Sequence, residues 1–371
     1  MDYRKLLPMI SLLFIGSFIA GCGVPATATT ATPALISVPP TSTFIATSTP
    51  TATVEPTLPP NETLLIFDDD GSRDGMAALL YLLIDPEISM QAINISYGEA
   101  HPEFYIQHVG RVFDELGITG IPLGAGQDAP LAGGTPFPGW LRQLSDNFWD
   151  YPLPNAGKTY PFQDAPELIV SVINQASEPV TIFLSGTFTN LAQALLLDAG
   201  IVDNISAVYI MGGAVSVPGN ITNLIPDSGN RVAEWNFLAD PQAAKDVFES
   251  GLELYMVPLD ATNKVILRRE DIFSWSRGGE KARMVADLYN IMFDKYGFES
   301  VEIFDLTAAV LMFRPDLCNF ESLHLDVITA EGDASGQTLM VPGEEPNVHV
   351  CLEPNATLIK QALNERFSSD Q

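Results

Sequence analysis

Basic residues are scarce in this chain. Of its 371 residues, 18 are Lys or Arg and 46 are Asp or Glu, so the formal net charge is −28. A negative charge of this size repels polyanions, which disfavours nucleic acid and anionic membrane surfaces as partners. The imbalance fits a soluble protein outside the cytoplasm, and it leaves the substrate open. Internal repeats are also missing, and the length suits one large α/β domain with appendages.

The N-terminal apolar run is too short to be a membrane span. Arg4 and Lys5 precede a mostly apolar stretch, residues 6–19, which ends in Ile-Ala-Gly-Cys at Cys22. A short apolar run that ends in small residues is typical of a signal peptide. Its ending resembles the bacterial lipobox, in which the cysteine is lipidated and becomes the first residue. The alternative is an ordinary signal peptide with an incidental cysteine.

Charge is absent from the next segment until Glu55. Residues 23–60 are almost entirely Thr, Pro, Ala and Ser, a composition that buries no core and stays extended. The predicted organisation is a signal peptide (1–22), a disordered linker (23–60) and a folded domain (61–371). We expect the protein outside the cytoplasm, anchored to the bacterial cell membrane by lipid on Cys22.

Cysteine is rare as well, with three in the chain. If Cys22 carries lipid, Cys318 and Cys351 are left as a pair. Two leftover thiols in an exported protein often form a disulfide. Two buried free thiols are the alternative, and we expect the bond.

Four carboxylates lie within seven residues where a strand is predicted to end and a helix to begin. Residues 64–67 form a short apolar run typical of a buried strand. Residues 76–83 form an apolar helical run, with Ser72 or Asp74 near its N-cap. The four acids are Asp68, Asp69, Asp70 and Asp74.

Acids this close in sequence raise one another's pKa unless a cation or a hydrogen-bonded ligand offsets their repulsion. Ligands of open α/β sheets bind at the edge where such a strand ends. The acidic turn therefore indicates a metal site, a diol-binding site or both. The alternative is a turn with one helix cap and three solvated aspartates.

Strands and helices alternate along the rest of the chain. This alternation predicts an α/β fold with an open, mostly parallel central sheet flanked by helices and a Rossmann-like core. A helix is expected at 102–116. Strands are expected at 91–96, 121–126, 180–184, 207–213 and 257–262, with closing strands at 325–327 and 347–350.

The acidic turn resembles the N-terminal signature of the inosine/uridine-preferring nucleoside hydrolases, D-x-D-x-x-x-D-D. Asp68, Asp70 and Asp74 match three of its acids, and Gly75 stands in place of the fourth. Other motifs follow in the family's order, and the resemblance covers about residues 64–367. They are Gly98-Glu99, Thr189-Asn190, Met211-Gly212-Gly213, Gly219-Asn220, Ala233-Glu234-Trp235-Asn236 and Phe304-Asp305.

The resemblance implies hydrolysis of the N-glycosidic bond of ribonucleosides to free base and ribose, with a nucleoside as the small-molecule partner. It implies Asp70 as the general base. It also implies a Ca²⁺ ion held by Asp70, Asp305 and the Thr189 carbonyl. Thr189 is alternatively an ordinary helix cap. The implied substrate-binding residues are Asp74, Glu99, Met211, Asn220, Glu234, Trp235 and Asn236.

Two departures from the family pattern bear on this mechanism. Gly75 offers no carboxylate, so we expect weaker Ca²⁺ binding and expect Gly75→Asp to tighten it. Phe304 replaces the histidine that protonates the leaving base, which leaves His101 or an aromatic stack from Trp235 as substitutes. The alternatives are a non-catalytic nucleoside- or ribose-binding lipoprotein and a hydrolase of another ribosyl compound. A homo-oligomer stays open.

The loop at 133–160 is rich in Pro, Gly and aromatic residues. A long loop of this kind can act as a lid, and Trp140, Phe148 and Trp149 are candidates to stack on a base. The alternative is that these rings pack the loop onto the body of the domain.

Overall fold

The computed structural model describes residues 62–370. The chain divides into two units, Met1–Thr53 and Val54–Gln371, and the description below concerns the second. The predicted signal peptide, linker and lipidation at Cys22 lie outside the described residues. Between residues 62 and 370 none of the helices has the length and apolar character needed to cross a membrane.

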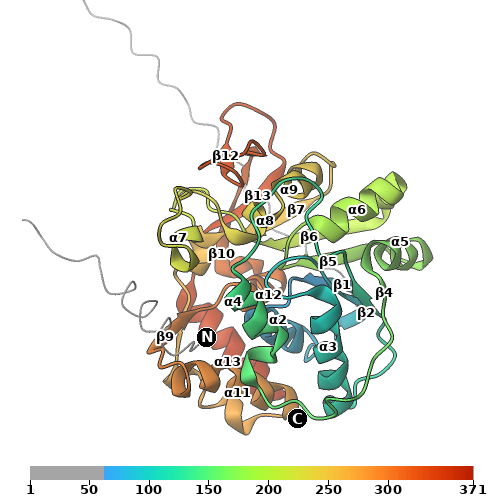
Figure 1. Cartoon of the computed structure of the whole chain (residues 1–371), viewed down its shortest axis with the longest axis vertical. Helices are drawn as coiled ribbons and strands as arrows, with labels where there is room; N and C mark the ends of the chain where they lie inside the picture. Colours follow the sequence, from blue (N-terminus) through green and yellow to red (C-terminus); the bar gives the residue numbers. More distant parts are fainter. Residues whose placement is uncertain (1–61, 371) are drawn as a thin grey trace, which may run out of the picture. The chain divides into compact units, whose positions relative to one another are not determined.

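A nine-stranded sheet forms the centre of the domain, in the order β10-β13-β7-β6-β5-β1-β2-β3-β4 (Figure 1). Every neighbouring pair is parallel except β10 with β13. The predicted open, mostly parallel sheet is therefore confirmed. Its strands are β1 (Thr63–Asp69), β2 (Ile88–Ile95), β3 (Leu123–Ala125), β4 (Gln163–Asp164), β5 (Val180–Leu184), β6 (Ile205–Met211), β7 (Leu254–Val257), β10 (Cys318–Leu323) and β13 (Val348–Pro354).

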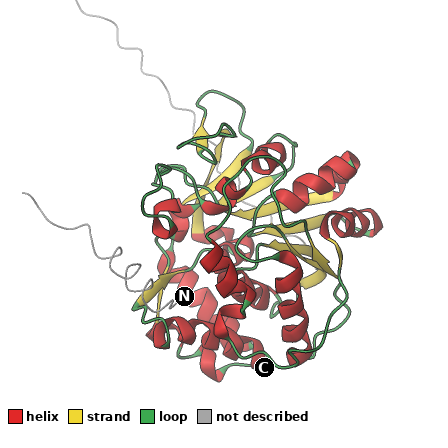
Figure 2. Ribbon diagram, viewed as in Figure 1, coloured by secondary structure: helices red, strands yellow, loops and turns green. Residues whose placement is uncertain are grey.

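Helices cover both faces of this sheet (Figure 2). Side chains alternate between the faces of a strand, so Leu65 and Phe67 of β1 join one core, while Ile66 joins the other. The first core includes α2 (Arg73–Leu82), α3 (Pro102–Leu116), α11 (Glu280–Asp294), α12 (Asp305–Phe313) and α13 (Ala356–Ser369). The second core includes α5 (Ala165–Gln175), α6 (Thr189–Leu197) and α9 (Pro241–Phe248).

The strand order reverses at β1. The chain runs outward from β1 through β2, β3 and β4 on one side, and through β5, β6 and β7 on the other. Connections leave the carboxyl ends of β1 and β5 in opposite directions, which opens a crevice between them. The acidic turn at residues 68–74 begins with the last two residues of β1, so the fold places it at this crevice.

Local chemistry explains where α2 begins. The Ser72 hydroxyl accepts a hydrogen bond from the Gly75 N–H at 2.6 Å, so Ser72 is the N-cap that satisfies an otherwise free helix donor. Gly71 has a φ of +86°, a backbone conformation that glycine adopts without a side-chain clash. The predicted helix therefore starts three residues earlier than its apolar run.

One predicted strand was wrong. Residues 257–262 do not form a strand, because β7 ends at Val257 and α10 (Leu259–Thr262) follows. Pro258 lacks an N–H for a strand ladder. The Asp260 carboxylate accepts hydrogen bonds from the N–H groups of Val215 at 2.8 Å and Ser216 at 2.7 Å, which stabilises the turn.

The remaining strands lie outside or at the edge of the main sheet. β11 (Leu325–Val327) pairs with β12 (Thr338–Met340), and β8 (Ile266–Arg268) pairs with β9 (Ser300–Glu302). Of the two predicted closing strands, only β13 joins the central sheet. A disulfide joins Cys318 of β10 to Cys351 of β13, and this links the edge strand β10 covalently to its neighbour.

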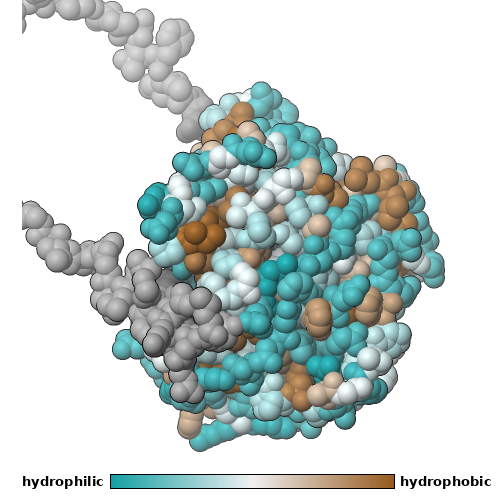
Figure 3. Space-filling model, viewed as in Figure 1, coloured by the Kyte–Doolittle hydropathy of each residue, from teal (hydrophilic) through white to brown (hydrophobic). Residues whose placement is uncertain are grey.

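Hydrophilic residues predominate on the face of the domain seen in Figure 3, in keeping with the strong negative charge. Apolar side chains are exposed mainly as single residues or short pairs. Leu196 and Leu197 of α6 form one such pair, at 75% and 60% exposure.

Candidate functional site

The acidic turn is bound to its own backbone and to the neighbouring strand. Oδ1 of Asp69 accepts hydrogen bonds from the N–H groups of Gly71 at 2.8 Å and Ser72 at 3.3 Å. Oδ2 of Asp69 accepts one from the Ser185 hydroxyl at 2.8 Å. Ser185 directly follows β5, so the buried Asp69 carboxylate joins the two strand ends that form the crevice.

Asp70 faces the turn after β2. Its Oδ2 accepts a hydrogen bond from the Glu99 N–H at 2.9 Å. Burial raises the pKa of Asp70 well above its ordinary value, and repulsion by Asp69 and Glu99 raises it further. Glu234 adds to this rise, so residues 70 and 234, far apart in sequence, face a common space.

Asp74 connects the first turn of α2 to the first turn of α12. Its Oδ2 accepts hydrogen bonds from the N–H groups of Phe304 at 2.5 Å and Asp305 at 2.7 Å. Its Oδ1 accepts one from the Tyr289 hydroxyl. Backbone N–H groups at a helix start favour a carboxylate. Asp74 is therefore largely occupied by the protein itself.

Asp305 lies in the same cluster. Its Oδ2 accepts a hydrogen bond from the Ser72 hydroxyl at 2.8 Å. Burial raises the pKa of Asp305 well above its ordinary value, followed by repulsion from Asp74 and then from Asp69 and Asp70. The predicted metal ligands Asp70 and Asp305 are thus close enough to affect each other's protonation.

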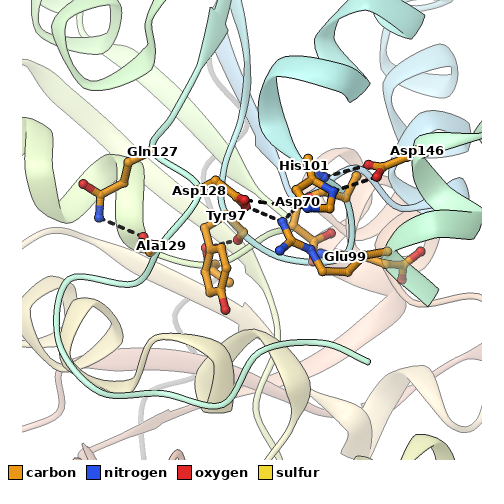
Figure 4. Close-up of polar contacts among 11 residues, drawn as sticks. Asp70, Tyr97, Glu99, His101, Gln127, Asp128, Ala129 and Asp146 are labelled. Carbon is orange, nitrogen blue, oxygen red and sulfur yellow. Dashed lines mark hydrogen bonds and ion pairs between the residues drawn. The ribbon is translucent and has the colours of Figure 1, made fainter. Parts of the chain in front are cut away.

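Glu99 and His101 lie beside Asp70 (Figure 4). The Ser145 hydroxyl donates to Oε1 of Glu99 at 2.8 Å, and burial raises the pKa of Glu99 to about 7. His101 is half-exposed, with Nδ1 2.6 Å from Asp146 and Nε2 3.7 Å from Asp128. Two carboxylates hold this imidazole, and its role as an acid for the leaving base stays a prediction.

Residues from the loop after β6 form the other side of the site. Oε2 of Glu234 accepts hydrogen bonds from the N–H groups of Asn236 at 2.9 Å and Gly213 at 3.2 Å. Burial raises the pKa of Glu234 to about 7. Nδ2 of Asn236 donates to the carbonyls of Ser185 at 3.0 Å and Met211 at 3.1 Å. Asn236 therefore joins the ends of β5 and β6.

Two polar atoms on this side have no partner within residues 62–370. They are Oδ1 of Asn220 and Nε1 of Trp235, both buried. The Trp235 ring stacks on Phe137, with ring centroids 4.7 Å apart. Buried polar atoms are normally hydrogen-bonded, so these two atoms are candidates to bind a ligand.

The site thus has two halves, which we name for their chemistry. The acidic half consists of Asp69, Asp70, Asp74, Glu99 and Asp305. The amide half consists of Met211, Asn220, Glu234, Trp235 and Asn236. All of these residues end a central strand, follow its carboxyl end or lie at the start of a helix beyond it.

Thr189 is the first residue of α6. Its hydroxyl donates to Oδ2 of Asp240 at 2.7 Å. The metal role of its carbonyl stays a prediction. The residue of this turn that contacts the acidic half is Ser185, which sequence reasoning missed. Its position directly after β5 was the signal that could have found it.

The space beside Gly75 is already taken. A Cβ at this position would lie 1.9 Å from Oδ2, 2.3 Å from Cγ and 2.5 Å from Oδ1 of Asp69. Three hydrogen bonds hold that carboxylate in place. The expectation that Gly75→Asp simply adds a ligand is therefore revised, because the new side chain would first have to displace Asp69.

The donor chemistry of the acidic half fits an oxygen-seeking divalent cation. Asp69, Asp70 and Asp305 are buried together, and a cation offsets the repulsion that raises the pKa of the latter two. Within residues 62–370, however, no three His, Cys, Asp or Glu side chains are arranged to hold a metal ion. Binding would require these carboxylates to turn toward one another.

An open parallel sheet with carboxylates and amides at its switch point defines a class of proteins that bind a small polar ligand at this edge. The family model described as inosine-uridine preferring nucleoside hydrolase matches residues 65–361. The chain belongs to this family and is therefore an enzyme that hydrolyses N-glycosidic bonds. Enzymes of the family are generally metal-dependent.

The matches to named relatives span nearly the whole length of those relatives. The pyrimidine-specific ribonucleoside hydrolase RihA of Salmonella newport is 29% identical over 321 residues, which make up 82% of this chain and 97% of the relative. A purine-preferring ribonucleoside hydrolase from Gardnerella vaginalis has a TM-score of 0.71 at 22% identity, covering 82% and 98%. The inosine-uridine preferring nucleoside hydrolase of Bacillus anthracis has a TM-score of 0.70 at 22% identity, covering 82% and 99%. The two solved structures show the shared fold.

Proposed function

We propose that this site hydrolyses ribonucleosides to free base and ribose, with Asp70 as the general base. The observation that carries the proposal is the placement of Asp70, buried at the switch point with the Glu99 N–H donating to its carboxylate. The hydrogen bond described for its side chain uses Oδ2, which leaves Oδ1 for a water molecule. In its ionised form, a carboxylate with a raised pKa is a stronger base.

In the proposed reaction, Asp70 takes a proton from water as the water oxygen attacks C1′ of the sugar. The sugar passes through a state with oxocarbenium character, which the negative charge of the acidic half stabilises. Asp70 and Asp305 would hold Ca²⁺, with the Thr189 carbonyl as the predicted third ligand. A bound divalent cation lowers the pKa of water.

The amide half is proposed to hold the substrate's hydroxyl groups. Asn220 and Glu234 supply acceptors. Asn236 lies beside them, and its side-chain amide donates a hydrogen bond to the Met211 carbonyl. In the acidic half, Asp74 has three donors already, and a carboxylate has about four acceptor positions. One position therefore remains for a sugar hydroxyl, and Glu99 belongs to the same acidic half.

A panel of purine and pyrimidine nucleosides tests this proposal. The purified protein is incubated with each nucleoside, with and without Ca²⁺, and free base and ribose are measured. Release of both products that is lost in Asp70→Asn supports the proposal. Nucleoside binding without any release would favour the non-catalytic alternative. Release of ribose from a different ribosyl compound, with none from the nucleosides, would favour the alternative of a hydrolase of another ribosyl compound.

We also propose that the mature protein begins at a lipidated Cys22 and is anchored outside the cytoplasm. The signal sequence, its Ile-Ala-Gly-Cys ending and the uncharged linker support this. Cys22→Ser should release a soluble form from the membrane fraction, and continued membrane binding would contradict the anchor. Sedimentation of that soluble form also decides between monomer and homo-oligomer.

A further inference from the structure

Arg73 is a cation beside the acidic half that forms no ion pair within residues 62–370. It opens α2 directly before Asp74 and is partly buried. Burial raises the pKa of Asp74 and Glu99, and the positive charge of Arg73 counteracts that rise. The guanidinium therefore lies close to both acids. Within the described residues it forms no ion pair with either of them, and its Nε is buried without a hydrogen-bond partner.

Two aromatic rings orient the guanidinium. Cζ of Arg73 lies 5.1 Å from the ring centroid of Trp149 and 5.3 Å from that of Tyr289. A cation over an aromatic face gains about 0.5–2 kcal/mol. Nε1 of Trp149 is also buried without a partner in the described part of the chain. Two adjacent buried donors are thus held in place with unused hydrogen-bonding capacity.

The backbone that carries Trp149 is strained. Phe148, Trp149 and Asp150 have φ values of +50°, +55° and +60°, each of which costs about 1–3 kcal/mol for a residue other than glycine. The Asp150 carboxylate fixes this turn through Tyr296 at 2.6 Å and Lys295 at 2.8 Å. Strained backbone persists only where its surroundings hold it in place. Here the turn held by Asp150 places the Trp149 indole against Arg73.

The chemistry of the leaving group explains why a cation is useful here. When an N-glycosidic bond breaks, its electron pair stays on the base, which becomes negative beside several carboxylates. A guanidinium is planar, always charged and a donor only. Its fork matches a neighbouring carbonyl oxygen and ring nitrogen that both accept, such as O6 and N7 of hypoxanthine or O2 and N1 of the departing uracil anion.

We propose that Arg73 is a catalytic residue that binds the leaving base and stabilises the negative charge it acquires. The inference rests on the proposed hydrolase function. The C1′–N bond breaks and its electron pair passes to the base nitrogen, while the water oxygen bonds to C1′. Asp70 accepts the water's proton and later releases it to solvent. The base anion, bound by Arg73, takes a proton from solvent and leaves neutral.

Two ribosides with different leaving groups test the inference. Uridine needs its leaving base stabilised, whereas 4-nitrophenyl β-ribofuranoside releases a nitrophenolate that is stable without help. For Arg73→Gln, kcat/KM for uridine should fall roughly 10²–10³-fold, the range for loss of one donor to developing charge. The nitrophenyl riboside should change less than about 3-fold on the same reasoning. An equal loss on both substrates, or no loss on uridine, overturns the inference.

Arg269→Gln is the matched control. Arg269 also lies over an aromatic ring, Phe293 at 5.3 Å, and pairs with Asp294 instead of facing the acidic half. The kcat/KM values of Arg269→Gln for both substrates should equal those of the wild type. If a melting experiment shows that Arg73→Gln does not fold, Arg73→Lys is measured in its place. A selective loss of kcat/KM for uridine then supports the inference, and an equal loss on both substrates overturns it. A wild-type protein that releases base from no nucleoside of the panel, and no nitrophenolate from the nitrophenyl riboside, refutes the proposed hydrolase function itself.

Discussion

The two halves of the site differ in how far the protein satisfies them. In the acidic half, backbone N–H groups and hydroxyls already donate to every carboxylate, and Asp74 alone accepts three hydrogen bonds. In the amide half, Oδ1 of Asn220 and Nε1 of Trp235 are buried without a partner in the described residues. Every carboxylate of the acidic half thus has at least one donor from the fold, whereas the amide half leaves one buried acceptor and one buried donor unfilled within the described residues.

This difference suggests a division of labour. Preorganised charges act on the transition state without reorganising at the moment of reaction, and the acidic half has that character. Unfilled hydrogen-bonding groups gain partners when a ligand arrives, and the amide half has that character. Changes in the acidic half should therefore affect turnover and folding, whereas changes in the amide half should affect mainly substrate binding.

The largest effect is expected from Asp70→Asn. The amide is isosteric with the carboxylate but accepts no proton from water, so kcat should fall about 10²–10⁴-fold. Steady-state release of free base measures it. Asp326→Asn, at an exposed carboxylate paired with Lys245, serves as the control. A kcat for Asp70→Asn within a few-fold of the control would remove Asp70 from the mechanism.

The unfolding free energy should depend on pH through Glu234, the buried acid of the amide half. Burial raises the pKa of Glu234 from 4.5 to about 7. Between these values the folded protein keeps a proton that the unfolded chain has lost. Raising the pH through this window therefore lowers the unfolding free energy, by roughly 3 kcal/mol at full effect. Glu234→Gln should lack this contribution, and urea denaturation at pH 5 and pH 8 measures the difference. Identical pH profiles for the two proteins would contradict the assignment.

Gly75 and Asp69 should be coupled in stability. Gly75→Asp overlaps the Asp69 carboxylate, and such overpacking costs about 1–3 kcal/mol. Combining it with Asp69→Ala removes the overlap, so the double variant should be more stable than the sum of the single changes predicts. A double-mutant cycle by urea denaturation measures this coupling. Additive losses would mean that the two side chains do not compete for space.

The smallest effect is expected from Asn220→Ala. Because Oδ1 of Asn220 has no partner in the described residues, its loss should leave the melting temperature unchanged. The missing hydrogen bond to substrate should raise KM roughly 3–10-fold, the equivalent of about 1 kcal/mol. A lower melting temperature with an unchanged KM would reverse the roles assigned to the two halves.

Much of the fold could be predicted from local sequence patterns. The helix at Pro102–Leu116 and the strand at Val180–Leu184 have the bounds predicted from sequence, because apolar periodicity and flanking turn residues act over short distances. The position of Asp70 at a strand end followed from the same reasoning. The strand predicted at 257–262 failed where Pro258 ended the ladder.

Long-range contacts explain what the sequence could not predict. Ser185 binds Asp69 across 116 positions, and Tyr289 binds Asp74 across 215 positions. The occupied space beside Gly75 likewise depends on where Asp69 turns. The aromatic surroundings of Arg73 require three segments to meet, so the local sequence around this residue does not predict them.

The central claim is most directly tested by measuring kcat and KM for one nucleoside with Asp70→Asn and Asn220→Ala under the same conditions. The account predicts that the first variant loses kcat and that the second raises KM with kcat within a few-fold of wild type. If both variants change the same parameter in the same proportion, the two halves do not divide turnover from binding, and the account is wrong.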